Sequence, residues 1–335
     1  MLAMSVLWPM GAASTAASVG LRERASPVRI IDAWWLAIRY NVPPLEYFLH
    51  QLWRSERRAR LDDYLYWHEN GPALAGLNAV VGGDGELGPV ANKQFFSEFC
   101  DGLDLPSPRS FGVWKKGDPV GENSLPRANL WLKPSCGSQG IGAERWRWKD
   151  GGYRRGALVL TPDAMAEHIA EHARQHSETL VQEVIKAWPS HAPIIGPSPL
   201  CARIVTGRRR NGDVDIIDAM AVWPREGSDI TQGGHIAMIE LHSGQIGPVY
   251  EASETCASRQ LEGSQLPNWQ EALDYVRKGH SELPHFIFLG WDIAFGDGGP
   301  VLLEANAGWG CFHFQAVPDH PIADTPFASI VEEYI

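Results

Sequence analysis

The sequence predicts an α+β protein in which most strands run antiparallel. Two observations lead to this prediction. Apolar residues in the first third recur with helical spacing, whereas from residue 129 onward short strand-like runs are separated by turns that contain glycine. Only two long helical patterns interrupt those runs, too few for the alternating strand–helix order of a parallel sheet. At about 150 residues per domain, 335 residues predict two or three packed units.

The first third of the chain is predicted to be helical. Apolar residues within 44–69 form one stripe with the spacing i, i+3, i+4 and i+7, namely Leu45, Phe48, Leu49 and Leu52. Another helix is expected to begin after Asn92, whose side chain is suited to cap it. The buried face of this second helix would consist of Phe95, Phe96, Phe99, Cys100 and Leu103.

The rest of the chain is predicted to contain strands and two helices. Thr161 and Pro162 provide a cap and a first residue for a helix over 162–176, and the other helix covers 268–283. Residues 284–306 would form a closing hairpin that turns at 296–299. The other predicted strands are 129–133, 143–149, 179–185, 200–206, 213–223, 235–241 and 245–250.

Charge and cysteine content exclude several classes of protein. The formal net charge of −11 argues against a chain that coats nucleic acid or an anionic membrane, so we expect neither as a partner. The five cysteines form no Cys-x-x-Cys pair, which argues against a disulfide framework or zinc ribbon and predicts a cytoplasmic location. The sequence contains no run of about 18 apolar residues, the length that a membrane-spanning helix requires.

Changes in composition divide the chain into four predicted segments. Residues 1–25 are expected to be a disordered leader, because their first part lacks the basic start and unbroken apolar stretch of an export signal. A helical and mixed N-terminal region follows over 26–128. A small subdomain covers 129–185, and the remaining C-terminal subdomain covers 186–335.

The closing hairpin carries two acidic residues that should face each other. Asp292 and Glu304 are placed symmetrically about residue 298 in the glycine turn, so antiparallel pairing brings them nearly opposite one another. Asn306 lies two residues beyond Glu304 and points to the same face. Two carboxylates and an amide oxygen in an apolar setting favour a hard cation, Mg²⁺ or Mn²⁺. The alternative is that Asp292 and Glu304 are surface acids near the turn that bind no metal, because such acids would show the same spacing.

Lys133 ends a predicted strand and precedes a glycine-rich loop, residues 135–142. Glycines let backbone N–H groups close over anionic oxygens, and a lysine at the strand end adds positive charge. A dinucleotide-binding fingerprint would require a helix after the loop, but residues 144–148 alternate arginine and tryptophan as a strand does. The loop is therefore expected to lie between two strands and to fold over a nucleotide as a flap.

Five segments of the chain occur in the order seen in ATP-grasp enzymes. They are Asn92-Lys93, Lys133-Pro134 with 137–142, Leu-Val-Gln-Glu-Val-Ile at 180–185, Ala-Arg-Ile-Val-Thr at 202–206, and Gly290-Trp291-Asp292 followed by Glu304-Ala305-Asn306. The chain most resembles the sugar-transfer associated ATP-grasp family. This resemblance covers roughly residues 41–318 and includes the lead-in at 62–78 and the glycines at 233–234.

The resemblance implies an ATP-grasp fold, in which a nucleotide is held between a small flap subdomain and the mostly antiparallel C-terminal sheet. It implies that Lys93 and Lys133 contact the phosphates of ATP and that Arg203 faces the γ-phosphate or the activated substrate. Lys133 and Arg203 are thus the catalytic candidates. The implied metal ligands are Asp292, Glu304 and Asn306. The other implied nucleotide contacts are Ser138, Gln139, Gly140, Ile141, Gly142, Gln182, Glu183, Val184, Ile185 and His191.

The reaction implied by the resemblance is the ATP-dependent ligation of a carboxylate to an amine. A substrate carboxylate would attack the γ-phosphate to give an acylphosphate, and an amine would then displace phosphate to form an amide or peptide bond. The substrates would be a small-molecule or peptide carboxylate and an amine. A phosphotransferase that stops after phosphoryl transfer and a nucleotide-binding protein without turnover are alternatives on the same fold. The sequence leaves the substrates and the oligomeric state open.

Residues 168–172 spell His-x-x-Glu-His, a pattern known from zinc peptidases. On a helix, His168 and His172 are four residues apart and could share a metal, with Glu171 as the general base of a zinc hydrolase. An amphipathic helix that turns its apolar side inward accounts for the same residues. We expect this second interpretation and keep the zinc hydrolase as an alternative.

Overall fold

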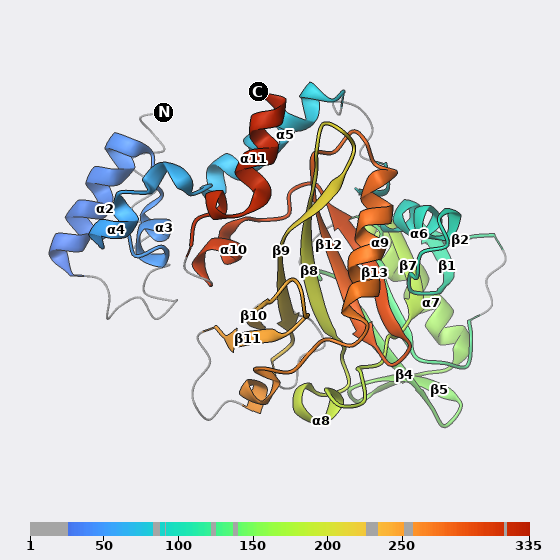
Figure 1. The fold of residues 1–335 in the computed structure, drawn as a ribbon. Coiled ribbons are helices and arrows are strands. Elements are labelled where there is room, and N and C mark those ends of the chain that lie inside the picture. The colour runs from blue at the N-terminus through green and yellow to red at the C-terminus, as the bar shows by residue number, and fades with distance from the viewer. Residues whose placement is uncertain are drawn as a thin grey trace. The chain divides into compact units, whose positions relative to one another are not determined.

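The computed structural model describes residues 26–82, 88–90, 92–121, 125–136, 140–225, 234–250, 257–317 and 320–335 (Figure 1). The predicted leader 1–25, three loop residues (Gly137, Ser138 and Gln139) and the glycine at 233 lie outside these ranges. The chain separates into two compact units. Of the described residues, one unit contains 26–76 together with 310–317, 320–333 and 335, and the other contains those within 77–309 together with 334.

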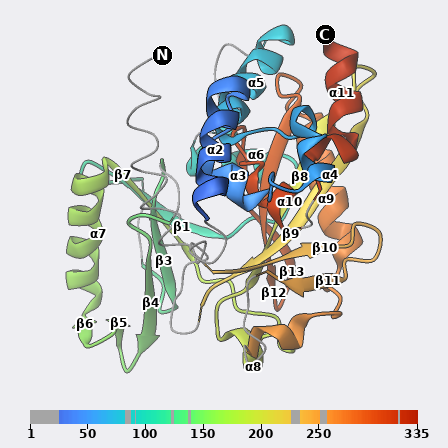
Figure 2. The same ribbon diagram turned by 90° about the vertical axis from the view of Figure 1, so that its left-hand side faces the viewer.

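A seven-stranded sheet in the larger unit has the strand order β2-β1-β7-β3-β4-β5-β6, and all its pairings are antiparallel. Helix α7 (Pro162–His176) lies along one face of this sheet (Figure 2). Met165 and Ile169 of α7 pack in one apolar cluster with Leu130, Trp146 and Val181 of the strands. The strands are β1 (Ser110–Lys115), β2 (Asp118–Val120), β3 (Leu130–Pro134), β4 (Glu144–Lys149), β5 (Gly152–Arg155), β6 (Leu158–Leu160) and β7 (Glu178–Glu183).

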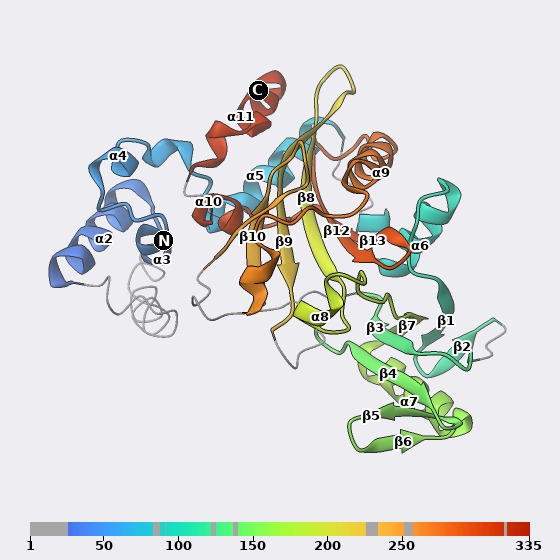
Figure 3. The same ribbon diagram turned by 60° about the horizontal axis from the view of Figure 1, so that its bottom comes forward.

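A six-stranded antiparallel sheet in the same unit has the order β11-β10-β9-β8-β12-β13. Helix α9 (Trp269–Ser281) covers one face, and α6 (Lys93–Gly102) contacts β13 (Figures 1 and 3). The strands are β8 (Leu200–Arg208), β9 (Val214–Trp223), β10 (His235–Ile239), β11 (Ile246–Val249), β12 (Phe288–Gly296) and β13 (Gly299–Asn306). Short helices are α8 (Ala192–Ile195), η3 (Gly88–Val90) and η4 (Ala257–Leu261).

These elements confirm the α+β class and most of the local predictions. Helix α7 has the predicted bounds, and the Thr161 hydroxyl accepts a hydrogen bond from the backbone N–H of Ala164. Asn92 caps α6 by accepting from the N–H groups of the next turn. The prediction that Phe95 is buried is wrong, because its ring is half exposed on the outer side of α6. The sequence analysis also missed strands β1, β2, β5 and β6.

The smaller unit contradicts the prediction of one helix over residues 44–69. The helix that begins at Pro44 ends at Leu49, and Gln51 takes a left-handed φ of 51° that a continuing helix does not tolerate. Buried Arg57 stabilises this break by donating to the carbonyl of His50. The helices of this unit are α2 (Pro27–Tyr40), α3 (Pro44–Leu49), α4 (Ser55–Arg58), η2 (Leu61–Asp63), α10 (Phe312–Ala316) and η5 (Ile322–Asp324). Helices α5 (Trp67–Val80) and α11 (Pro326–Tyr334) belong mainly to it.

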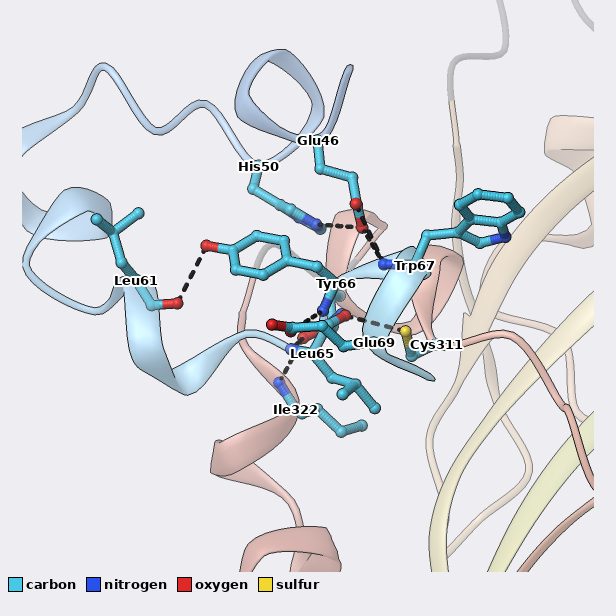
Figure 4. Close-up of polar contacts among 10 residues, drawn as sticks. Glu46, His50, Leu61, Leu65, Tyr66, Trp67, Glu69, Cys311 and Ile322 are labelled. Atoms are coloured by element: carbon cyan, nitrogen blue, oxygen red, sulfur yellow. Dashed lines mark hydrogen bonds and ion pairs between the residues drawn. The ribbon is translucent and has the colours of Figure 1, made fainter. Parts of the chain in front are cut away.

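Buried polar side chains join remote segments of the smaller unit (Figure 4). The amide of Gln315 donates to the carbonyl of Leu65, and its oxygen accepts from the backbone N–H groups of Leu65 and Ile322. Cys311 donates its thiol hydrogen to the same Leu65 carbonyl, and burial raises the pKa of this thiol to about 12. Buried polar groups are stable only when paired, so these bonds hold the early and late segments together.

Among the described residues, no helix combines the length and the apolar character that crossing a bilayer requires.

A buried histidine makes the stability of the larger unit depend on pH. His280 of α9 is fully buried, and its Nε2–H donates to the carbonyl of Phe286 while Nδ1 lies 2.7 Å from the Thr206 hydroxyl oxygen. Burial lowers the pKa of His280 to about 4, from the usual histidine value of about 6.5. Between these pH values the unfolded chain binds a proton that the folded chain does not. Stability is therefore complete above about pH 6.5 and decreases as the pH falls.

We expect the free energy of unfolding to fall by up to about 1.4 kcal/mol per pH unit through His280 between about pH 6.5 and the folded pKa of about 4. His280→Gln should reduce the slope of this decline, measured by urea unfolding at several pH values. His242→Gln, at an exposed position, controls for the general effect of the exchange. Equal slopes in His280→Gln and the parent protein would contradict this assignment.

Candidate functional site

A row of charged side chains crosses three neighbouring strands of the six-stranded sheet. Arg203 on β8 is the register partner of Asp292 on β12, and Asp292 is the partner of Glu304 on β13. The predicted opposition of the two carboxylates is thus confirmed. The Arg203 guanidinium binds Asp292 through two bonds of 2.7 Å, from Nε to Oδ1 and from Nη2 to Oδ2. Such a two-bond pair fixes the orientation of both groups.

The third charge of the row is neutralised from another element. Lys93, the first residue of α6, places its Nζ 3.2 Å from Oε2 of Glu304, and Asn306 donates its amide Nδ2–H to Oε1 at 3.3 Å. The backbone N–H of Lys93 donates to the carbonyl of Ser135, directly after β3. Helix α6 therefore ties the base of the glycine-rich loop to the strand that carries Glu304.

Burial and mutual attraction set the protonation of this cluster. Burial, with Glu304 adding to it, raises the pKa of Asp292 against the opposing effect of Arg203. Burial would also raise the pKa of Glu304, but Lys93 and the other partners outweigh it and hold that pKa below the usual value. Burial lowers the pKa of Lys133 to about 8, although Glu304 attracts its proton. Three cations thus face two carboxyl groups near neutral pH, an arrangement suited to an anionic ligand.

The oxygen atoms at this site are suited to a hard divalent cation. Among the described residues, no group of three or more His, Cys, Asp or Glu side chains could hold a metal, so Asp292 and Glu304 need another oxygen donor. Asn306 uses its amide nitrogen toward Glu304, which leaves the amide oxygen as that donor. Two carboxylates and an amide oxygen fit the ligand preference of Mg²⁺ or Mn²⁺.

The end of the glycine-rich loop is held by α7. Gly140 and Gly142 both have a positive φ, of 68° and 77°, which glycine adopts without strain. His172 donates from Nε2 to the carbonyl of Gly142 at 2.7 Å, and its Nδ1 lies 2.7 Å from the Thr179 hydroxyl oxygen. Ile141 between the two glycines is largely exposed.

The zinc-hydrolase alternative is therefore wrong for these residues. Both ring nitrogens of His172 are engaged, His168 contacts Glu144 at 2.7 Å, and exposed Glu171 accepts from Arg174. The three side chains have different partners and do not converge on one ion. The sequence analysis missed the structural role of His172, although the four-residue spacing of the histidines indicated that they share one helix face.

The predicted hinge strand leads from one sheet to the other. The Gln182 amide donates to the carbonyl of Pro108, and Glu183 accepts from the backbone N–H of Arg109. Val184 and Ile185 follow β7 and are half-buried, and the chain then pairs at Ala187 with Gly296 of β12. His191 is buried beyond this segment, and burial lowers its pKa. Adenine and ribose contacts of these residues stay predictions.

The sequence analysis also missed a close contact between Gly290 and Trp309, next to the charged row. A Cβ atom on Gly290 would lie 2.3 Å from Cβ of the buried Trp309. The carbonyl of Trp309 in turn accepts from Nη1 of Arg203 at 3.4 Å. Gly290 is therefore the residue that lets Trp309 pack beside the site.

A family model described as sugar-transfer associated ATP-grasp matches residues 85–325, more than half of the chain. Comparison with curated protein sequences gave no significant match.

Several solved structures are similar to the chain at low sequence identity. D-alanyl-alanine synthetase A from Vibrio cholerae O1 biovar eltor str. N16961 shows 14% identity and a TM-score of 0.42 over 73% of this chain and 65% of that chain. D-alanine–D-alanine ligase from Bacillus anthracis, complexed with ATP, shows 12% identity and a TM-score of 0.45 over 74% of this chain and 66% of that chain. L-amino acid ligase from Bacillus licheniformis shows 15% identity and a TM-score of 0.40 over 68% of this chain and 43% of that chain. The chain thus spans less than two-thirds of the length of each.

Gly290→Ala should lower the free energy of unfolding by about 1–3 kcal/mol, because the added methyl group collides with Trp309 in a packed core. Gly298→Ala is the matched control, since a Cβ there meets nothing within 4 Å, and its effect should stay within about 0.5 kcal/mol. Urea unfolding of both variants measures the difference. Equal stability of the two would show that the close approach is not a constraint.

Proposed function

Because the chain belongs to the sugar-transfer associated ATP-grasp family, we propose that it is an ATP-dependent carboxylate–amine ligase that acts through an acylphosphate. Its two antiparallel sheets have the ATP-grasp fold. The observation that carries the proposal is the half-buried row of Arg203, Asp292, Glu304 and Lys93 beside Lys133. The excess of positive charge in this row suits a polyphosphate, and its carboxylates suit the accompanying cation.

Each part of the site receives a role in this proposal. Lys93 and Lys133 would contact the phosphates of ATP, and the loop that ends at Gly142 would cover them with backbone N–H groups. Residues 183–185 would meet the adenine, and His191 the ribose. Mg²⁺ or Mn²⁺ would be held by Asp292, Glu304 and Asn306, and when bound it would offset negative charge on the phosphates.

The chemistry consists of two substitutions. An oxygen of the substrate carboxylate attacks the γ-phosphorus, the bond to the bridging oxygen breaks, and ADP leaves. The amine then attacks the acyl carbon, loses a proton, and expels inorganic phosphate to leave an amide. Lys133 and Arg203 would stabilise the charge spread over the transferring phosphoryl group, which is the main protein contribution to this kind of reaction.

The reaction class is tested by product analysis. ADP release is screened over amino acids, sugar acids and peptides as carboxylates, each with and without amines, and the products are identified by mass spectrometry. An amide that forms together with ADP and phosphate supports the ligase. A stable phosphorylated product that does not depend on an amine would instead identify a phosphotransferase and contradict ligation.

Lys133→Met should weaken ATP binding by about 1.5–3 kcal/mol, because one charge-assisted contact to phosphate is lost. Isothermal titration calorimetry measures the affinity, and circular dichroism verifies the fold. Lys149→Met removes an exposed lysine at the end of β4 and should bind ATP as the parent protein does. An unchanged affinity in Lys133→Met would refute its phosphate contact.

Glu304→Gln should abolish ADP formation in a protein that stays folded, because it removes one anionic ligand of the metal and the partner of Lys93. Nucleotide binding should persist, since the hinge and Lys133 are unchanged. Glu282→Gln, at an exposed position after α9, is the control and should keep full activity. Full ADP formation by Glu304→Gln with an unaltered Mg²⁺ requirement would overturn the metal site.

A further inference from the structure

The three histidines of α7 face one short segment of the chain. His168, His172 and His176 are spaced four residues apart, so they lie on one side of the helix. Nε2 of His168 lies 2.7 Å from Oε2 of Glu144, and Nε2 of His172 lies 2.7 Å from the carbonyl oxygen of Gly142. His176 packs on the ring of His172, with the ring centroids 4.5 Å apart. The histidines therefore lie against the segment that leads from the glycine-rich loop into β4.

The sheet does not position the end of this loop by itself. The pairing of β3 with β4 ends at Glu144, and residues 140–143 lie beyond it. They form a turn in which the backbone N–H of Ala143 donates to the carbonyl of Gly140 at 3.0 Å. We call residues 140–143 the loop turn. Contacts outside the sheet must position it.

The loop turn fits closely against α7 at Gly142. A Cβ atom on Gly142 would lie 2.9 Å from the imidazole of His176 and 3.0 Å from the ring of Pro134. The φ of Gly142 is 77°, in the left-handed region that glycine adopts without strain. This close fit presents the carbonyl of Gly142 to His172.

The partners of His172 determine which ring nitrogen carries the hydrogen. A carbonyl oxygen only accepts, so Nε2 of His172 donates to Gly142. In the neutral ring Nδ1 then accepts, and the Thr179 hydroxyl donates to it at 2.7 Å. Burial of His172 lowers its pKa, which favours this neutral form. His172 is thus held by β7 on one side and holds the loop turn on the other.

We propose that His172 is a positioning residue for ATP, because it holds the loop turn where the backbone N–H groups of that turn meet the phosphates. This inference rests on the proposed function and adds to it a residue outside the phosphate contacts. Backbone N–H groups bind an anion well when they are already held in place, whereas ordering a mobile turn costs binding energy. The His-x-x-Glu-His pattern then has a role without zinc.

Paired substitutions of His172 test this role. His172→Leu removes the donor, and the shorter amide of His172→Asn lies near the position of Nδ1, so it reaches Thr179 but not Gly142. The amide of His172→Gln extends to the position of Nε2 and keeps the bond. By isothermal titration calorimetry, His172→Leu and His172→Asn should bind ATP about five- to tenfold more weakly, and His172→Gln within about twofold of the parent protein.

Two further measurements separate positioning from a purely structural role. Amide exchange at Ala143 should be faster in His172→Leu and His172→Asn than in the parent protein and His172→Gln, because this amide closes the loop turn. Nitrogen-15 spectra of the parent protein should show the Nε2–H form of the His172 ring. If His172 only supported the fold, ATP affinity would fall together with the melting temperature in all three variants, including His172→Gln.

Gly142→Ala tests the same bond from the loop and decides the matter if His172→Leu and His172→Asn do not fold. Its methyl group would collide with His176 and displace the carbonyl from His172, so ATP should again bind more weakly. Gly156→Ala is the matched control and should bind ATP as the parent protein does. Gly156 also has a positive φ, of 59°, but a Cβ atom there meets nothing within 4 Å.

The role of His172 is overturned if the parent protein binds ATP and a folded His172→Leu binds it equally well, or if Gly142→Ala does so where His172→Leu does not fold. An Nδ1–H form of the ring also overturns it, because Nε2 could then not donate to Gly142. A parent protein that binds no ATP contradicts the proposed function, and this inference with it.

Discussion

The need to pair charges inside an apolar sheet constrains the larger unit. Asp292 and Glu304 lie on adjacent strands with Trp291 and Leu302 in the core beside them, and unpaired carboxylates there would cost several kcal/mol each. Arg203 and Lys93 remove that cost from opposite sides of the row. A slip of one residue in β8 or β13 would turn Arg203 or Glu304 to the other face, so pairing of the charges and strand register support each other.

Two helices hold the ends of the glycine-rich loop, and one of them, α6, also contacts the charged row. Helix α6 holds the start of the loop through the bond from Lys93 to the Ser135 carbonyl, and α7 holds its end through the bond from His172 to the Gly142 carbonyl. Both bonds go to the backbone, so they fix the path of the chain at the two ends of the loop. The phosphate-binding role that we propose needs this fixation, because backbone N–H groups bind anions well only when they are held in place.

Buried polar groups are also paired in the smaller unit, where they join segments of the backbone. Gln315 and Cys311 satisfy the backbone of Leu65, and buried Glu46 accepts from the backbone N–H of Trp67. These bonds replace the regular pairing that a sheet would provide, because the chain there runs through short helices and turns. The inner side of α2 belongs to this core.

Local patterns in the sequence were sufficient for the closing hairpin, for α7 and for the Asn92 cap, because each depends on spacing within one element or around one turn. The same patterns predicted that Asp292 and Glu304 face each other, and family resemblance added ATP and the metal. Only the tertiary structure showed that the helix from residue 44 stops at Leu49, that Lys93 reaches Glu304, and that His172 holds Gly142. These features depend on contacts between residues far apart in the chain, and apolar periodicity carries no information about which distant partner a residue meets.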